Sequence, residues 1–201
     1  MQVLILFSLL GVALCEYPDW ANEGKFGESQ IAKRSLRAGN ETSSYLIKVS
    51  SSSSVWTSDM TCVRATTKET TRDNFETTAT FKYSNVPTST SAKVTLSNFY
   101  DYVTYQNGFK SVAPGQGSTT IKVAHSVTFS NYGSCSIYYN KEGEYAPAKN
   151  EGSYELWVTK EKRDDLPPCC NFLFKYLTLN EETRDVYTKG CDKTAANQQT
   201  A

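Results

Sequence analysis

The sequence predicts a single all-β domain with a helix near each end, and three observations support this fold class. The 201 residues are 39% hydrophobic, which is enough for one buried core, and this length favours one domain over two. Between residues 45 and 159, short segments rich in β-branched and aromatic residues alternate with clusters of Ser, Asn, Gly and Pro. The flanking segments carry helix-forming composition or helical periodicity. Seven or eight strands at this spacing are typical of an antiparallel sandwich or an up-and-down barrel.

The first segment, residues 1–15, has the sequence MQVLILFSLLGVALC and carries no charged side chain. It is too short to span a bilayer comfortably, and Ala13 and Cys15 suit the −3 and −1 positions of a cleavage site. We therefore predict a signal peptide over residues 1–15, one domain over residues 16–201 and a secreted, extracellular protein. No later segment approaches about 18 apolar residues, so no membrane anchor or membrane partner is expected.

Helix-forming residues between positions 19 and 37 predict an N-terminal helix. Gly24 and Gly27 count against this prediction, because glycine is unfavourable inside a helix. Polar clusters at residues 50–54, 84–91 and 114–117 mark connections between the strands that follow. The predicted strands cover residues 45–49, 60–64, 75–83, 92–105, 119–129, 135–139 and 154–159.

A helix is predicted after the last strand. Asp164 or Asp165 could cap it, and two prolines, at positions 167 and 168, fall in its first turn. Its apolar face follows the spacing i, i+3, i+4, i+7 and consists of Cys170, Leu173, Phe174 and Leu177. We expect this face to pack on the outer wall of the barrel, with Cys169 rotated about 100° away from it.

Charge and motif content exclude several function classes. The 21 Lys and Arg residues equal the 21 Asp and Glu residues, and no basic stripe indicates a nucleic-acid partner. His125 is the sole histidine, so a Ser-His-Asp triad would depend on this one residue, and its place in a strand-like run favours a non-catalytic role. No CxxC pair, HExxH helix, P-loop or GxGxxG motif is present. We therefore expect no enzyme, no metal site and no cofactor.

Asn40 begins the sequence Asn-Glu-Thr, an N-glycosylation sequon just before the first predicted strand. In a secreted chain, and at a loop position, it is expected to be glycosylated.

Several spaced motifs resemble those of one known family. They occur in the order PDWA at residues 18–21, SLRA at 35–38, VW at 55–56, TCV at 61–63, YELW at 154–157 and ETRDVY at 182–187. Over essentially the whole mature chain, this pattern resembles the histamine-binding lipocalins of tick saliva. The resemblance implies an eight-stranded barrel with an N-terminal helix at one end and a C-terminal helix against its side. It also implies a secreted carrier that sequesters a small host mediator at the feeding site.

The resemblance further implies the pairing of the cysteines. Cys62 would bond Cys191, and Cys135 would bond the start of the last helix through Cys169 or Cys170. The position of Cys170 on the apolar helix face favours Cys170 as the partner. Cys169 would then remain free or link two chains in a disulfide-bonded dimer.

The ligand site implied by the family centres on a Glu-x-Trp strand motif, which here is Glu155 and Trp157. Residues at i and i+2 of a strand share one face, as a common pocket requires. In this family such an acid faces into the cavity and such a ring stacks on the ligand. Trp56 matches another pocket ring of the family, and Phe109 is expected to supply a third.

Other acids of the family pattern are absent from this chain. Ser53 and Ser126 stand where two pocket acids would be, and we include both among the expected ligand-binding residues. A third acid falls near Ala92, and at the second site of the family Ser136 and Gly39 replace acids. Each desolvated amine–carboxylate hydrogen bond contributes about 1.5–3 kcal/mol, so these losses weaken the electrostatic case for histamine.

Three hypotheses follow for a chain of this kind. The first is a scavenger of a biogenic amine such as histamine, with Glu155 as the counter-ion. The second is a carrier of an apolar ligand, such as a fatty acid, an eicosanoid or a sterol, in a mostly neutral cavity. The third, weaker hypothesis is a module that engages a host immune protein through its surface and uses the barrel as a scaffold.

Overall fold

A computed structural model describes residues 24–38, 43–50, 53, 55–102, 104–114, 118–142, 152–179 and 181–191. The predicted signal peptide, the sequon at Asn40 and the family position at Gly39 lie outside the described residues.

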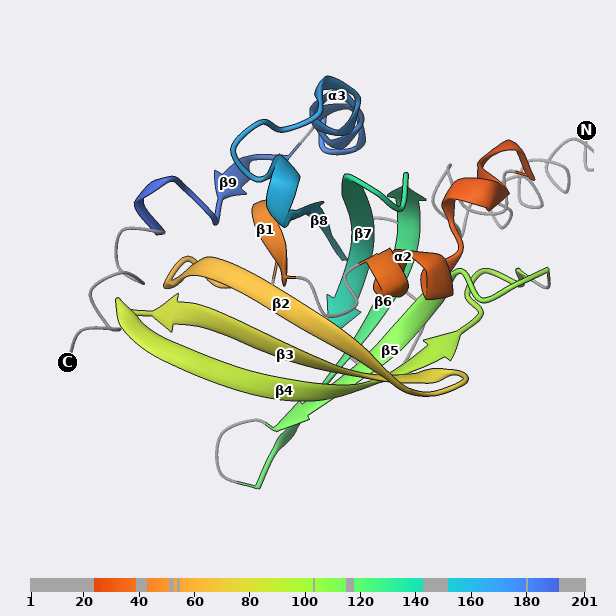
Figure 1. Ribbon diagram of the computed structural model, residues 1–201, viewed down its shortest axis with the longest axis horizontal. Coiled ribbons are helices and arrows are strands. Elements are labelled where there is room, and N and C mark those ends of the chain that lie inside the picture. Colours follow the sequence, from red (N-terminus) through yellow and green to blue (C-terminus); the bar gives the residue numbers. More distant parts are fainter. Residues whose placement is uncertain are drawn as a thin grey trace, which may run out of the picture.

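Eight antiparallel strands form a closed barrel, shown in Figure 1. They are β1 (Ser43–Ser50), β2 (Met60–Thr71), β3 (Asn74–Tyr83), β4 (Val86–Ser97), β5 (Gly108–Pro114), β6 (Thr120–Ser130), β7 (Cys135–Glu142) and β8 (Ser153–Thr159). Neighbours in sequence pair with one another, and β1 closes the ring by pairing with both β8 and β2. The predicted barrel is therefore confirmed, and the alternative of a sandwich is excluded.

Three barrel strands depart from the prediction. Strand β2 ends at Thr71, seven residues beyond the end of the predicted strand over residues 60–64. Strand β4 begins at Val86 and ends at Ser97, whereas the sequence predicted a strand over residues 92–105 after a polar connection. Ser84 and Asn85 both have positive φ (47° and 67°), so a two-residue hairpin turn comes directly after β3 and the following Ser- and Thr-rich run is already strand. Strand β5 was not predicted at all, because the 92–105 segment was taken to be continuous.

The N-terminal helix is divided. The described residues contain a 3₁₀ helix, η1 (Gly24–Ser29), and an α-helix, α2 (Ala32–Ala38), instead of one helix over residues 19–37. Between them, the Ile31 N–H donates to the Tyr132 hydroxyl at 2.9 Å, and the Ala32 N–H donates to the Gln106 carbonyl at 3.0 Å. These backbone donors are thus used by the barrel instead of a continuous helix. Helix α2 contacts β2 and β6 at one end of the barrel.

The C-terminal helix, α3 (Pro168–Leu177), packs against β7 and β8 outside the barrel (Figure 1). Cys170 and Phe174 on its predicted face are completely buried, and Leu173 and Leu177 pack against the same cluster. The predicted cap is wrong: the N-cap residue is Pro167, and no side chain of Asp164 or Asp165 caps the helix. Pro supplies the φ that a first turn needs, so the helix begins without a polar cap.

Two disulfides link distant segments, in the pairs that the resemblance implied. Cys62–Cys191 joins β2 to the C-terminal segment, and Cys135–Cys170 joins β7 to α3. The paired residues are 129 and 35 positions apart, so each bond stabilises the fold by about 3–5 kcal/mol in the chain-entropy model. Cys169 is exposed and unpaired.

A short ninth strand, β9 (Thr183–Asp185), pairs with β1 and was not predicted. It brings the C-terminal segment to the end of the barrel that carries the β1–β2 connection. The Lys48 ammonium pairs with the Asp185 carboxylate at 2.5 Å, and Val186 is buried beside them.

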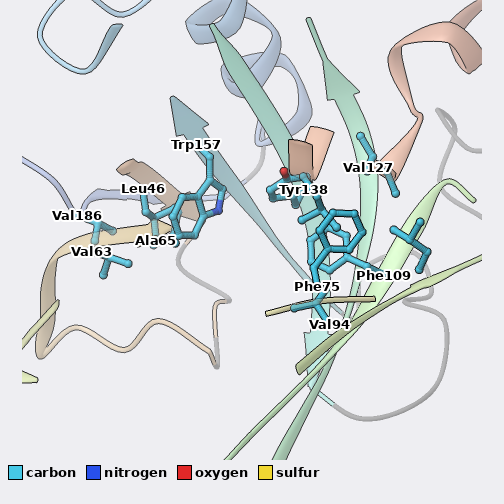
Figure 2. Close-up of a cluster of buried hydrophobic side chains, with 14 residues drawn as sticks. Leu46, Val63, Ala65, Phe75, Val94, Phe109, Val127, Tyr138, Trp157 and Val186 are labelled. Carbon is cyan, nitrogen blue, oxygen red and sulfur yellow. The ribbon is translucent and has the colours of Figure 1, made fainter. Parts of the chain in front are cut away.

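Alternation along the strands separates two hydrophobic clusters. On β7, Ile137 and Tyr139 face outward into a cluster that includes Cys170 and Phe174 of α3. Tyr138, between them, faces inward into a second cluster within the barrel. In Figure 2, Trp157 lies on one side of this inner cluster, and the rings of Tyr138 and Phe109 lie on the other.

Candidate functional site

The interior of the barrel holds a cavity of about 850 Å³. Its described lining is mostly apolar, aromatic or hydroxyl-bearing, and Glu155 is the one lining residue with a charged side chain. The predicted residues Trp56, Phe109 and Trp157 line the same cavity. A concave, largely apolar cavity with a few polar groups is the usual form of a small-molecule site.

Glu155 lies on β8, two residues before Trp157, and it is 1% exposed. The Trp56 indole N–H donates to Glu155 Oε1 at 2.5 Å, and the Trp157 indole N–H donates to Oε2 at 2.6 Å. The Asn140 amide also donates to Oε1. Its own Oδ1 accepts from the Ser153 hydroxyl at 2.9 Å, which fixes the orientation of the amide. Both carboxylate oxygens are therefore held in place by neutral donors.

The charge of this carboxylate has no neutralising partner among the described residues. No Lys or Arg lines the cavity, and no ion pair involves Glu155 in the described part of the chain. Burial raises the pKa of Glu155 to about 7, and the hydrogen bonds from Trp157 and Trp56 act in the opposite direction. A buried carboxylate held by neutral donors alone is suited to receive a cation from the ligand.

Trp56 comes from the β1–β2 connection, and its position is set by contacts outside the cavity. Its backbone N–H donates to Ser53 Oγ at 3.0 Å. The guanidinium of Arg184, on β9, donates to the carbonyls of Trp56 and Thr57 at 2.9 Å and to that of Met60 at 3.1 Å. Through these hydrogen bonds, β9 fixes the position of the loop that brings the Trp56 indole to Glu155.

At the end of the barrel near α2, three rings form one wall of the cavity. Phe109 and His125 stack with ring centroids 4.7 Å apart, and both contact Tyr138, at centroid distances of 5.3 and 6.3 Å. The Tyr138 hydroxyl is 2.7 Å from the hydroxyl of Ser35 on α2. Burial raises the pKa of Tyr138 and lowers the pKa of His125 to about 3, so both rings are neutral at physiological pH.

The two predicted serines do not line the main cavity. Ser53 borders a smaller hollow behind Trp56 and positions that residue through the hydrogen bond above. Ser126 is buried on the outward face of β6, where it pairs with the outward-facing Tyr139 of β7. The preceding residue, His125, faces the cavity. The expected cavity position of Ser126 is thus one residue out of register, since successive strand residues alternate between the two faces.

Other positions where the family pattern has acids are neutral and lie where a ligand would meet them. Ala92 and Ser136 both line the cavity. Ser136 shares hydrogen bonds of 2.9 Å with Ser35 and with Ser130. The end of the cavity near α2 is therefore hydroxyl-lined instead of acidic.

Across the described ranges, no three His, Cys, Asp or Glu side chains lie in an arrangement that could hold a metal ion. No helix among the described residues is long and apolar enough to cross a membrane.

Comparison with known proteins places this barrel in a family. The profile described as "Tick histamine binding protein" matches residues 20–193. The "Male-specific histamine-binding salivary protein" of Rhipicephalus appendiculatus is 32% identical over 207 residues, which cover 98% of this chain and 100% of that protein.

Solved structures share the fold at lower identity. Japanin from Rhipicephalus appendiculatus, solved bound to cholesterol, gives a TM-score of 0.54 at 15% identity over 75% of this chain and 94% of its own. AM182, solved as a serotonin complex, gives 0.53 at 23% identity over 83% of this chain and 95% of its own. Both structures share the lipocalin barrel fold with this chain. From the profile match and the full-length relative together, the chain belongs to the tick histamine-binding protein family.

Proposed function

We propose that this protein is a secreted salivary lipocalin that binds one small biogenic amine, such as histamine, and thereby suppresses inflammation at the feeding site. The observation that carries the proposal is Glu155, a buried carboxylate inside the cavity with three N–H donors and no cationic partner among the described residues. A protonated amine would provide that missing charge. The relatives' names support the ligand class, because they are described as histamine-binding.

The aromatic groups around Glu155 support a cation for a second reason. The rings of Trp56 and Trp157 have centroids 6.1 Å apart at an interplanar angle of 68°, so they form two sides of a corner at the carboxylate. Aromatic faces attract cations by about 0.5–2 kcal/mol in such positions. The two indoles would thus hold the carboxylate through their N–H groups and present ring surface to the ligand.

The volume and neutrality of the cavity favour a second candidate, a carrier of an apolar ligand such as a fatty acid, an eicosanoid or a sterol. A cavity of about 850 Å³ is large for a single small amine, and its described lining has one charged residue. Burial of apolar ligand surface, at about 25 cal/mol per Å², would then drive binding.

Calorimetric titration of histamine into the secreted protein tests the proposal. We expect one molecule bound per chain and an affinity about tenfold weaker, or more, in Glu155→Gln, since a charge-assisted hydrogen bond is lost. Glu161→Gln, which changes an exposed carboxylate of the short helix η2 (Lys160–Lys162), is the matched control and should bind as the unaltered protein does. Absence of heat together with absence of competition by any amine would reject the amine hypothesis.

Native mass spectrometry of the secreted protein, followed by extraction of whatever the barrel carries, distinguishes the two candidates. An amine in the extract supports the first, and a fatty acid, eicosanoid or sterol supports the second. The same spectrum reports removal of residues 1–15 and glycosylation at Asn40, which are parts of the proposal that concern secretion.

A further inference from the structure

We infer that His125 is a second recognition point in the cavity, which binds an uncharged hydrogen-bonding group on the aromatic ring of the ligand. The preferred ligand would then be an arylalkylamine whose ring carries an O–H or N–H group, held by its ammonium at Glu155 and by its ring substituent at His125. This inference rests on the proposed amine-binding function and extends it to the part of the ligand that Glu155 does not contact.

The first step is that His125 lines the cavity but has no hydrogen-bond partner. The residue is 8% exposed, and its Nδ1 is buried, so Nε2 is the ring nitrogen that can meet a ligand. Nε2 makes no hydrogen bond to any residue in the described ranges. A ring nitrogen that is accessible from a cavity and has no protein partner is available to a hydrogen-bonding group of a ligand.

The neighbouring polar groups are already used. The hydroxyls of Ser35, Ser130, Ser136 and Tyr138 bond one another at 2.7–2.9 Å. On β7, directly opposite His125, the amide of Asn140 is held between Glu155 and Ser153. Among the polar side chains on this wall, the imidazole therefore has hydrogen-bonding capacity left for a ligand.

The ring is also held in one orientation. Phe109 stacks on its face with an interplanar angle of 16°, and the Tyr138 ring meets it at 82°. A neutral imidazole has one N–H donor and one acceptor nitrogen, so it can accept from an O–H or N–H group or donate to an oxygen. Burial lowers the pKa of His125 to about 3, which keeps this neutral form throughout the physiological range.

The strand register sets the spacing between the two recognition points. His125 on β6 is opposite Asn140 on β7, and Glu155 on β8 is opposite Tyr138 on β7. The two residues are therefore two strands apart and offset by two residues along β7, which places their Cα atoms about 12 Å apart, and both line the cavity. A ligand with one aromatic ring and a two-carbon amine arm fits this separation.

The test uses ligands that differ by one hydroxyl group. Phenethylamine is compared with its 3-hydroxy and 4-hydroxy derivatives by calorimetry. In the unaltered protein we expect at least one hydroxylated amine to bind about tenfold more tightly than phenethylamine, because a site with an unpaired buried group favours the ligand that satisfies it. In His125→Phe, which keeps an aromatic ring against Phe109, this preference should disappear, so that the three amines bind with similar affinities.

A second measurement does not depend on the folding of a variant. Because the chain has one histidine, ¹⁵N-labelling of histidine gives a single imidazole signal pair. Addition of the preferred hydroxylated amine should shift one ring nitrogen in the direction of a new hydrogen bond, and phenethylamine should leave both signals nearly unchanged.

The outcomes separate this inference from the proposed function. If all three amines bind equally and the imidazole signals do not move, His125 is not a recognition point, although the amine site stands. If none of the three amines binds, both the function and the inference are rejected. If Glu155→Gln weakens all three amines by the same factor and His125→Phe removes the difference between the hydroxylated amine and phenethylamine, the two roles are established separately.

Discussion

Amine binding should depend on pH through the ionisation of Glu155. Burial raises the pKa of this carboxyl to about 7, so the free protein carries a proton there at pH 5 and loses it by pH 8. A protonated amine binds the ionised form, and therefore binding at acidic pH must first release a proton. Between pH 8 and pH 5 the ionised fraction falls about a hundredfold, which corresponds to about 2.7 kcal/mol of binding free energy.

The assay is calorimetry at pH 5, 6, 7 and 8 with an amine that remains protonated throughout. The affinity should fall about tenfold for each pH unit below about 6 and level off above about 8. In buffers of different ionisation enthalpy, the measured heats should show release of about one proton per amine at pH 5 and almost none at pH 8. An affinity that is equal at pH 5 and pH 8, with no proton released, would refute the role of Glu155 as the counter-ion.

Three further predictions concern other parts of the molecule. Arg184→Lys should weaken amine binding about tenfold, because one ammonium nitrogen cannot take the places of the two guanidinium nitrogens that donate to three carbonyls at the Trp56 loop. The control Arg64→Lys, on the exposed surface of β2, should leave binding unchanged, and equal affinities of the two variants in calorimetry would contradict the prediction. The ¹⁵N signals of His125 should not titrate between pH 5 and 8, because burial lowers the pKa of the ring to about 3. An NMR titration midpoint near 6.5 would show that the ring is not buried. We propose that Cys169 forms a disulfide between two chains, since its thiol is exposed and Phe172 and Tyr176 of the same helix are 71% and 62% exposed. Non-reducing electrophoresis should show a dimer, which reduction or Cys169→Ser should abolish. A monomer under non-reducing conditions would reject this proposal.

The barrel could be predicted because its strands carry local signals. Strand β8 has β-branched and aromatic residues on both faces, and it is buried on both faces because α3 covers its outer side. The relation between Glu155 and Trp157 follows from strand alternation alone, and the structure places both in the cavity as expected. The resemblance to the family, carried by motifs spread over the chain, implied the disulfide pairs that the structure contains.

No local pattern in the sequence predicted which polar side chains line the cavity or hold its residues in place. Whether His125 or Ser126 faces inward depends on the register of β6 against its neighbours, and a shift of one residue reverses the answer. Asn140 meets Glu155 because of the register in which β7 and β8 pair, which no local pattern in the sequence specifies. The role of Arg184 was also missed, although it belongs to the ETRDVY motif, because its partners are backbone carbonyls about 125 residues away.

The central claim, that a single buried carboxylate selects a cationic ligand, is tested most directly by comparing phenethylamine with its uncharged isostere 2-phenylethanol. The two ligands have nearly the same shape, and both are titrated by calorimetry into the unaltered protein and into Glu155→Gln. We predict that the unaltered protein binds the amine at least tenfold more tightly than the alcohol and that the variant binds the two about equally. Equal binding of amine and alcohol by the unaltered protein would contradict the account and favour a carrier of apolar ligands.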